Sequence, residues 1–377
     1  MMKLTDVVNR INGNVDRFTT DLEYYIGGEH FESRELEISN KGLIKPNLNI
    51  LGFKFHFAFQ ERDVIFMARN PHLRKAGMVF FSGLCSDASY ILRSKDEKIL
   101  TQEYLAVMLQ SDHFWDYCEA HKVGSVNFAI NWKTMANYEF DLPSLEKQNE
   151  ISKKVWAAYR LKKSYKKLIE ATDEMVKSQF IEMFSAMPTT PVKTYVDDSF
   201  PGEWGTEDTI GDGVKVIRTT NFTNSGKLNL ADVVTRSIED RKVSRKQIKK
   251  YDTILERSGG TADNPVGRVV LFEEDDLFLC NNFTQVLRFK DIDPRFAFYS
   301  LYYFYQTNKT AIRSMGSKTT GIQNLNMSKY LEIGIPNASD KEQKEFVAIA
   351  EQADKSKFEL RKSIEAIDAV IKSLING

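Results

Sequence analysis

The chain has 377 residues with 42% hydrophobic side chains, and its 52 basic residues are balanced by 52 acidic ones. This length and composition predict a globular protein of two to three domains, each with its own core, and the zero net charge excludes a surface that is basic throughout. Three cysteines are too few for a disulfide framework, and the sequence has neither an N-terminal signal core nor an uncharged apolar run of about 18 residues, so we expect a cytoplasmic protein.

Residues 1–143 are predicted to form a mixed α/β head. Short runs of β-branched and aromatic residues, such as 63–67 and 78–81, are separated by Gly, Asn and Asp turns and predict strands. Residues 102–120 predict one amphipathic helix. A polar cap at Ser144 followed by an early acid then opens a segment without Gly or Pro that ends before Pro188, which is typical of a long helix.

The second half of the chain repeats the first. Residues 24–31 pair with 215–222 at an offset of 191, and residues 104–124 match 296–316 without a gap, which predicts a second amphipathic helix over 295–312. Two copies are too few for a solenoid, so we expect two similar heads related by a pseudo-twofold axis. The predicted parts are a head at 1–143, a long helix at 144–187, a head at 188–336 and a long helix at 337–377.

Both long helices carry the pattern of a coiled coil. In the second helix, apolar residues recur at alternating steps of four and three, with Lys357 inside the stripe, and subtracting 195 gives a matching stripe in the first helix with Lys162 at the same place. We therefore expect the two stripes to pack on one another. The residues predicted to lie at this helix–helix interface are Ile151, Val155, Tyr165, Ile169, Val176, Leu360, Ile364, Ile367, Ile371 and Leu374.

Motifs for catalysis are scarce. The sequence contains no Gly-x-x-x-x-Gly-Lys-Ser/Thr phosphate loop, no Gly-x-Ser-x-Gly elbow and no His-Glu-x-x-His pair. Cys118 and His121, with His113 nearby, could be metal ligands, but packing of an amphipathic helix is the favoured interpretation. The Asn-Pro pairs at 70–71 and 264–265 are similar to part of a methyltransferase motif and are better explained as turns. We predict no cofactor and no metal.

Loops rich in hydrogen-bond donors occur at matching places in both heads. Arg suits the acceptor pair of guanine, Asn and Gln suit adenine, and Ser, Thr and backbone amides suit phosphates, although any one such residue is as readily explained as part of an ordinary polar loop. The candidate DNA-binding residues are Gly28, His30, Arg69, Asn70, Arg74, Lys75, Ser125 and Asn127 in the first head, and Arg218, Thr219, Thr220, Asn221, Arg257, Ser258, Gly260, Asn264, Lys318, Thr319, Thr320, Gln323 and Asn324 in the second.

Two further segments are locally basic in spite of the zero net charge. Residues 151–169 hold seven cations and no acid, and residues 236–250 hold seven cations and two acids. Either could contact a polyanion, but a solvated flank of the coiled coil is the favoured explanation for the first.

The order of head, long helix, head and long helix resembles the DNA-specificity (S) subunit of type I restriction–modification enzymes. The junctions Asp-Leu-Pro-Ser-Leu-Glu-Lys-Gln-Asn-Glu-Ile (141–151) and Gly-Ile-Pro-Asn-Ala-Ser-Asp-Lys-Glu-Gln-Lys (334–344) are similar to the family's Pro-Leu-Pro-Pro-Leu-x-x-Gln-like entry into each spacer helix, and Asp252-Thr253-Ile254-Leu255-x-Arg257 resembles a stretch of its target-recognition domains.

This resemblance implies two α/β target-recognition domains separated by two long antiparallel coiled-coil helices, in a subunit without catalytic activity. Each head would read one half of an interrupted site in double-stranded DNA, and the helices would set the gap. Two methyltransferase (M) subunits would dock around the helices, and restriction (R) motor-nuclease subunits would join for cleavage.

Two alternatives remain open. The chain could be the recognition module of a single-chain restriction–methylation enzyme, or a coiled-coil assembly protein that does not read sequence.

Overall fold

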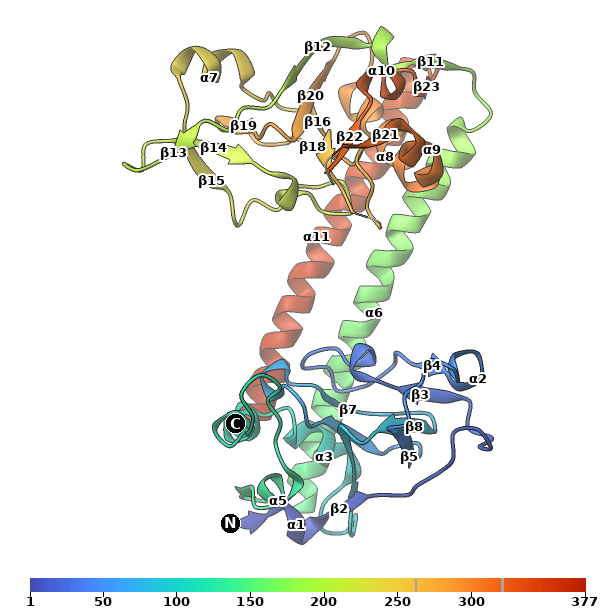
Figure 1. Ribbon diagram of the computed structural model, residues 1–377, viewed down its shortest axis with the longest axis vertical. Helices are drawn as coiled ribbons and strands as arrows, with labels where there is room; N and C mark the ends of the chain where they lie inside the picture. The colour runs from blue at the N-terminus through green and yellow to red at the C-terminus, as the bar shows by residue number, and fades with distance from the viewer. Residues whose placement is uncertain (262, 320–321) are drawn as a thin grey trace. The chain divides into compact units, whose positions relative to one another are not determined.

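The computed structural model describes residues 1–261, 263–319 and 322–377, apart from the side chains of 318 and 319, and divides into two compact units (Figure 1). Unit 1 comprises residues 1–169 together with 358–377, and unit 2 comprises residues 170–357. The predicted long helices are present as α6 (Leu145–Phe184) and α11 (Asp340–Asn376), and each contributes to both units. Within the described residues, no helix combines the length and apolar character needed to cross a membrane.

Unit 1 contains two four-stranded sheets and a two-stranded ribbon. In the first sheet every pairing is antiparallel, whereas in the second β3 and β8 run parallel. The first sheet has the order β2 (Val8–Ile11), β9 (Ser89–Ser94), β6 (Val64–Met67) and β7 (Ala76–Met78), the second has the order β4 (Gly42–Leu43), β3 (Tyr24–Ile26), β8 (Gly83–Ser86) and β5 (Phe55–Phe59), and β1 (Met2–Lys3) pairs with β10 (Glu139–Phe140).

The helices of the unit 1 head are short. They are α1 (Leu4–Val7), α2 (Ile44–Asn47), α3 (Gln102–Met108), α4 (Asp112–Ala120) and α5 (Trp132–Met135). The single helix predicted over 102–120 is therefore wrong in detail. The Ser111 side chain accepts a hydrogen bond from the Phe114 N–H and starts a new helix, because a serine cap satisfies an amide that would otherwise lack a partner.

Unit 2 repeats this plan and adds a three-stranded sheet. Its first sheet has the order β12 (Val196–Pro201), β20 (Thr284–Phe289), β16 (Thr253–Glu256) and β18 (Val269–Leu271), its second has the order β13 (Thr206–Glu207), β15 (Val234–Ser237), β14 (Val214–Ile217) and β19 (Phe278–Cys280), and β11 (Thr189–Pro191) pairs with β23 (Gly334–Pro336). The added sheet has the order β17 (Ser258–Gly259), β22 (Ile322–Leu325) and β21 (Gly316–Thr319).

The helices of the unit 2 head are α7 (Asp240–Lys246), α8 (Pro294–Thr307), α9 (Lys309–Met315) and α10 (Met327–Tyr330). The one helix predicted over 295–312 is again two, because the chain breaks at Asn308, whose backbone leaves the helical region. Asn308 alone separates α8 from α9. At its other end α9 is followed directly by β21, which begins at Gly316.

The internal repeat is confirmed by strand register. The parallel pair β3–β8 aligns Ile26 with Cys85, and the parallel pair β14–β19 aligns Ile217 with Cys280. Asp63 is buried and accepts hydrogen bonds from Arg93 Nε at 2.8 Å and Nη2 at 2.9 Å. Asp252 is buried in the same place of unit 2 and accepts from Arg288 Nε at 2.9 Å and Nη2 at 2.7 Å. Each sheet thus contains the same buried carboxylate, which is paired because an isolated one would be costly.

A buried glutamine joins each long helix to its head. Gln148 of α6 accepts from the Thr101 N–H at 3.0 Å and donates to the carbonyl oxygens of Ile99 and Pro143. Gln343 of α11 accepts from the Asp293 N–H at 2.9 Å and donates to the Ala338 carbonyl at 2.9 Å. These are the glutamines of the two junction motifs, and they pair backbone groups that the turn into each helix leaves unsatisfied.

The long helices are part of the cores of both units. In unit 1, Val155, Trp156 and Tyr159 of α6 belong to the core of the head, and Ile371 and Leu374 of α11 pack against it. In unit 2, the core combines side chains of both helices with those of α8, namely Val176, Phe180, Phe184, Phe296, Tyr299, Tyr303, Phe346, Val347, Ala350 and Ala353. In each unit one hydrophobic cluster therefore includes side chains of both long helices, while further clusters are formed by residues of the head alone.

Candidate nucleic-acid interface

Three segments of unit 1 that carry predicted site residues lie side by side. The Asn70 N–H donates to the Phe128 carbonyl at 2.8 Å, and the Ile130 N–H donates to the Ala68 carbonyl at 3.0 Å, so the loop after β6 runs beside the hairpin at 123–129. Lys75 Nζ donates to the Gly28 carbonyl at 2.8 Å and joins the turn after β3 to the same loop. The fold thus brings together the turn at 27–30, the loop at 69–75 and the hairpin at 123–129.

The predicted residues of unit 1 differ in how available they are. Arg69, Ser125 and Asn127 are exposed. Asn70 is half-buried and has a left-handed backbone with φ of 51°, which asparagine tolerates better than most residues. His30 Nδ1 accepts a hydrogen bond from the Gly27 N–H at 2.9 Å and so holds its own turn.

Arg74 is paired with carboxylates of α4. Its guanidinium forms an ion pair with Asp112 and lies 3.4 Å from Asp116, while Lys372 of α11 lies 3.7 Å from Asp112. The hydrogen bond from Arg74, with the charges of neighbouring cations, holds the pKa of Asp112 below its ordinary value despite the opposing effect of burial. The charge of Arg74 is therefore balanced within the protein.

In unit 2 the corresponding segments also converge. β17 pairs with β22, with Ser258 opposite Asn324 and Gly259 opposite Gln323. Ser258 Oγ donates to Asn324 Oδ1 at 2.7 Å, and Arg268 Nη2 donates to the Thr219 carbonyl at 3.5 Å. Thr219 follows Gly28 by the repeat offset of 191, so a cation holds the equivalent turn in each unit.

The turn after β14 is built largely by its own side chains. Asn221 is buried and accepts from the Arg218 N–H at 2.8 Å, while its amide donates to the carbonyl oxygens of Asn229 and Asp232. Arg218 donates to the Asp232 carboxylate at 2.9 Å. Thr219 is half-buried and Thr220 is exposed. Of these four predicted residues, Thr220 has the most solvent-accessible side chain.

The loop after β16 presents Arg257 beside a glycine turn. Arg257 is half-buried, and its Nη1 donates to Gln285 Oε1 at 3.5 Å, which is a long hydrogen bond. Gly260 has φ of +65°, and a Cβ there would lie 2.8 Å from the Val266 nitrogen, so only glycine fits. Asn264 is half-buried, and its N–H donates to Thr261 Oγ1 at 3.0 Å.

Gln323 and Asn324 lie half-buried on β22. Lys318 and Thr319 lie on β21, paired with Gln323 and Ile322, but their side chains are outside the described part of the structure. Thr320 lies outside the described residues altogether. Of the predicted residues on the segment 317–324, the structure therefore describes the side chains of two.

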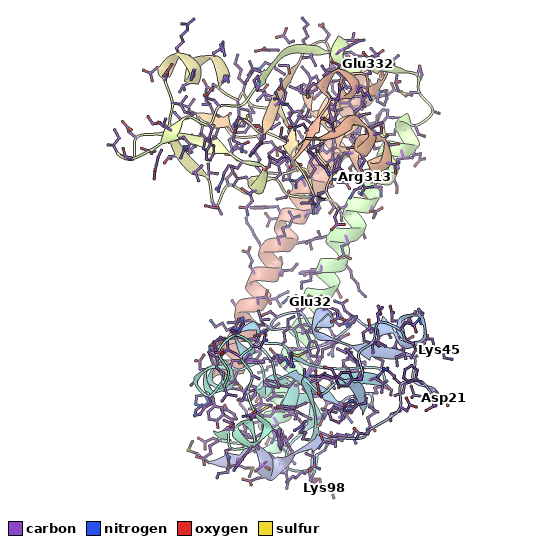
Figure 2. The ribbon with its side chains drawn as sticks, viewed as in Figure 1. Asp21, Glu32, Lys45, Lys98, Arg313 and Glu332 are labelled. Atoms are coloured by element: carbon purple, nitrogen blue, oxygen red, sulfur yellow. The ribbon has the colours of Figure 1, made fainter. Side chains whose placement is uncertain are left out.

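Sequence analysis missed several polar residues beside these loops. Arg268, the residue before β18, forms an ion pair with the buried Glu256, with Nε 2.7 Å from Oε2. Burial lowers the pKa of Arg268, but the bond to Glu256 outweighs it and the net shift is upward. The sequence contained a signal for this pair, because Glu256 and Arg268 each stand next to an apolar run that forms a strand. Arg313 of α9, exposed on the surface of unit 2, lies three residues before β21 begins (Figure 2).

The predicted interface residues of the long helices are all at least half-buried. Val155 and Val176 are buried, and the other eight, namely Ile151, Tyr165, Ile169, Leu360, Ile364, Ile367, Ile371 and Leu374, are half-buried. Within unit 1, Lys162 faces Asp368 while the earlier Val155 lies in the core against which the later Leu374 packs, so the two helix segments are antiparallel.

The candidate metal ligands of α4 each have another environment. Cys118 is fully buried, His121 stacks on Tyr117 with ring centroids 4.2 Å apart, and His113 Nδ1 lies 2.7 Å from the Tyr138 hydroxyl. Among the described residues, no group of three or more His, Cys, Asp or Glu side chains could hold a metal ion. Burial raises the pKa of the Cys85 thiol to about 12, which makes it unreactive.

Comparisons with known proteins identify one matching family model and a shared fold. The type I restriction modification DNA specificity domain matches residues 1–171 and 205–368. No match was found among curated protein sequences. Solved structures that share the fold include the following two. A chain from a structure on complex assembly and conformational transition of the type I R-M system is 15% identical with a TM-score of 0.56, covering 99% of this chain and 95% of its own. The type I restriction–modification S subunit from M. genitalium is 12% identical with a TM-score of 0.55, covering 99% and 94%.

Proposed function

Because the chain belongs to the type I restriction–modification DNA-specificity family, we propose that it reads an interrupted DNA sequence in two halves, one half with each unit. Its family membership makes it a non-catalytic subunit with a role in DNA sequence specificity. In this proposal residues 1–143 and 188–336 are the two target-recognition domains, and the helical segments 144–187 and 337–377 are the spacers.

The observation that carries the proposal is the repeated surface of three loops. In unit 1 and again in unit 2, hydrogen bonds bring together the turn after the parallel strand, the loop after the buried central strand and a later hairpin. These loops present donors such as Arg69 and Asn127 in unit 1 and Arg257 and Gln323 in unit 2. Two separate polar surfaces suit two half-sites, and joining them multiplies weak individual affinities through effective concentration.

We further propose that two methyltransferase subunits dock on the long helices and that restriction subunits join this complex. One similar chain comes from a structure of type I R-M complex assembly. Leu161 of α6 and Phe358 of α11 expose 44% and 54% of their surface, although both lie on helices that bury apolar residues elsewhere. Single exposed apolar side chains are common on protein surfaces, so these two positions are sites to test for docking and the proposal rests on the family. Such partners could supply much of the phosphate-binding charge that this neutral chain lacks.

Selection from random-sequence DNA tests the proposal. The full chain with its methyltransferase partner is expected to enrich two short conserved blocks separated by a gap of constant length. Enrichment of no sequence would favour a coiled-coil assembly protein without readout. Methyl transfer to DNA by this chain alone would favour a single-chain enzyme and contradict the assignment as a non-catalytic subunit.

Replacing Arg257 with alanine tests the reading surface of unit 2. If the guanidinium makes a bidentate contact with guanine, the variant should lose about 1–3 kcal/mol of binding free energy and relax selectivity in one half-site only. Affinities for single-base variants across both half-sites measure this. Lys290→Ala is the control. Lys290 Nζ lies 3.1 Å from the Asp197 carboxylate, and neither residue belongs to the three loops. An equal loss of affinity for every sequence would indicate a phosphate contact, and no change would show that this loop does not read DNA.

A further inference from the structure

Each long helix carries one buried lysine in its apolar stripe. Lys162 of α6 and Lys357 of α11 are 9% and 8% exposed. In unit 1, Lys162 Nζ lies 2.8 Å from an Asp368 carboxylate oxygen of α11. In unit 2, Lys357 forms the same kind of ion pair with Asp173 of α6. Each buried lysine is therefore paired with an acid of the opposite helix.

The two ion pairs are equivalent under the internal repeat. Lys357 follows Lys162 by 195 residues, and Asp368 follows Asp173 by the same 195. The helices exchange roles between the units: α6 provides the lysine in unit 1 and the aspartate in unit 2. A single alignment of two antiparallel helices satisfies both pairs.

The apolar stripe alone would accept other alignments, because its steps of four and three repeat every seven residues. The two nearest alternative alignments, which differ by seven residues in either direction, are both unfavourable for the lysines. A slip of seven residues in one direction would place Lys162 opposite Arg361 and Lys357 opposite Lys166, bringing like charges together. A slip in the other direction would place them opposite Ile375 and Phe180, leaving two lysines against apolar side chains.

Both lysines are held by a second acid, so they are well paired where they lie. Lys162 is 3.3 Å from Glu35 of the unit 1 head, and Lys357 is 2.9 Å from Asp354. Burial lowers the pKa of Lys162, but the hydrogen bond to Asp368 and the charge of Glu35 outweigh it and the net shift is upward. Lys162 therefore stays charged at neutral pH. A buried ion pair contributes little stability compared with apolar residues of the same size, yet a polar residue in a coiled coil can determine register.

We propose that the pairs Lys162–Asp368 and Lys357–Asp173 determine the register of α6 against α11 and thereby select the gap length between the two half-sites. The second part rests on the proposed function. A slip of seven residues moves one helix by about 10 Å, and this corresponds to about 3 base pairs of B-DNA. The apolar residues hold the helices together, while the two ion pairs select one alignment among several that the apolar stripe permits.

The test replaces both lysines with methionine, which has a similar shape and no charge. The full chain carrying Lys162→Met and Lys357→Met, with its methyltransferase partner, is selected on DNA libraries with variable gaps. We expect the wild type to enrich one gap length and the variant to enrich at least two that differ by about 3 base pairs. Enrichment of the same single gap by the variant would overturn the inference.

Two further variants separate charge at these positions from charge in general. Lys162→Arg with Lys357→Arg keeps both ion pairs and is expected to keep one gap length. Lys154→Met with Lys362→Met removes two exposed cations of the same helices, whose partners Glu150 and Glu359 are local, and is also expected to keep one. A broadened gap preference in this control would contradict a specific role for the buried pairs.

Register can also be measured without DNA. Spin labels on cysteines introduced at the exposed positions Arg160 and Glu365, both in unit 1, report the distance between α6 and α11. Labels should react at these sites because the three native cysteines are buried. We expect one distance population in the wild-type background and a second in the double methionine variant. One population in both would refute the register inference even if a two-part site is found, whereas two populations without any two-part site would refute the proposed function instead.

Discussion

Truncating Phe346 to alanine is expected to destabilise unit 2 by about 3–5 kcal/mol. Phe346 of α11 is fully buried, and its ring centroid lies 5.1 Å from that of Phe180, 5.7 Å from that of Phe184 and 5.5 Å from that of Tyr299. One side chain thus joins both long helices to α8. Its loss removes apolar contacts and leaves a cavity that aromatic neighbours cannot easily fill.

Native-state hydrogen exchange measures this effect in unit 2, because the opening free energy of the α8 amides should fall by the predicted amount. Phe358→Ala is the matched control on the same helix. Phe358 is 54% exposed, so its removal should change stability by no more than about 0.5 kcal/mol. Similar losses for the two variants would show that α11 does not complete the core of unit 2.

Replacing Asp252 with alanine is expected to cost about 3 kcal/mol of unit 2 stability, at the lower end of the range for breaking a buried ion pair. The carboxylate is 3% exposed in its side chain and accepts hydrogen bonds from two guanidinium nitrogens of Arg288 and from the Lys249 N–H. Without it, the Lys249 amide loses its acceptor, and a guanidinium whose side chain is 19% exposed loses its bidentate carboxylate and keeps the Gln247 carbonyl at 3.2 Å and the Asp198 carboxylate at 3.7 Å.

Opening free energies of the β16 and β20 amides measure this loss. Asp275→Ala is the control, since that carboxylate is 82% exposed and pairs with Lys250 at the surface. Such surface pairs contribute about 0–1 kcal/mol. If Asp252→Ala costs no more than Asp275→Ala, the repeated aspartate–arginine pair is not a stabilising feature of the two sheets.

Both predictions concern side chains whose importance arises from long-range contacts. Phe346 is an apolar residue in the first turns of the second long helix, but its contacts with α8 depend on how the second head folds against that helix. Asp252 was noticed as part of a motif, whereas its partner Arg288 lies 36 residues further along the chain. A residue's spacing along the chain indicates its face of a helix or strand, and the partner across that face is decided in three dimensions.

The candidate DNA-binding loops also combine features visible in the sequence with features that only the structure shows. The matching positions of donor-rich loops were visible in the sequence, and the fold brings those loops together by backbone hydrogen bonds in each unit. The distribution of their side chains was not visible. His30 and Asn221 bond to their own turns and Arg74 pairs with Asp112, while Arg69 is exposed. Local hydrogen bonding and ion pairing, which depend on neighbours, decide which donors remain available.

By itself, the sequence determined the repeat, the mixed α/β heads, the two long helices and the family, because periodic apolar spacing, capping residues and junction motifs are local properties of a chain. Only the tertiary structure decided that one hydrophobic cluster of each unit includes side chains of both long helices, that the helices predicted over 102–120 and 295–312 are each divided in two, and that the two buried lysines meet repeat-equivalent aspartates. Those features depend on contacts between residues far apart in the chain, where packing and charge pairing choose among arrangements that local patterns permit equally.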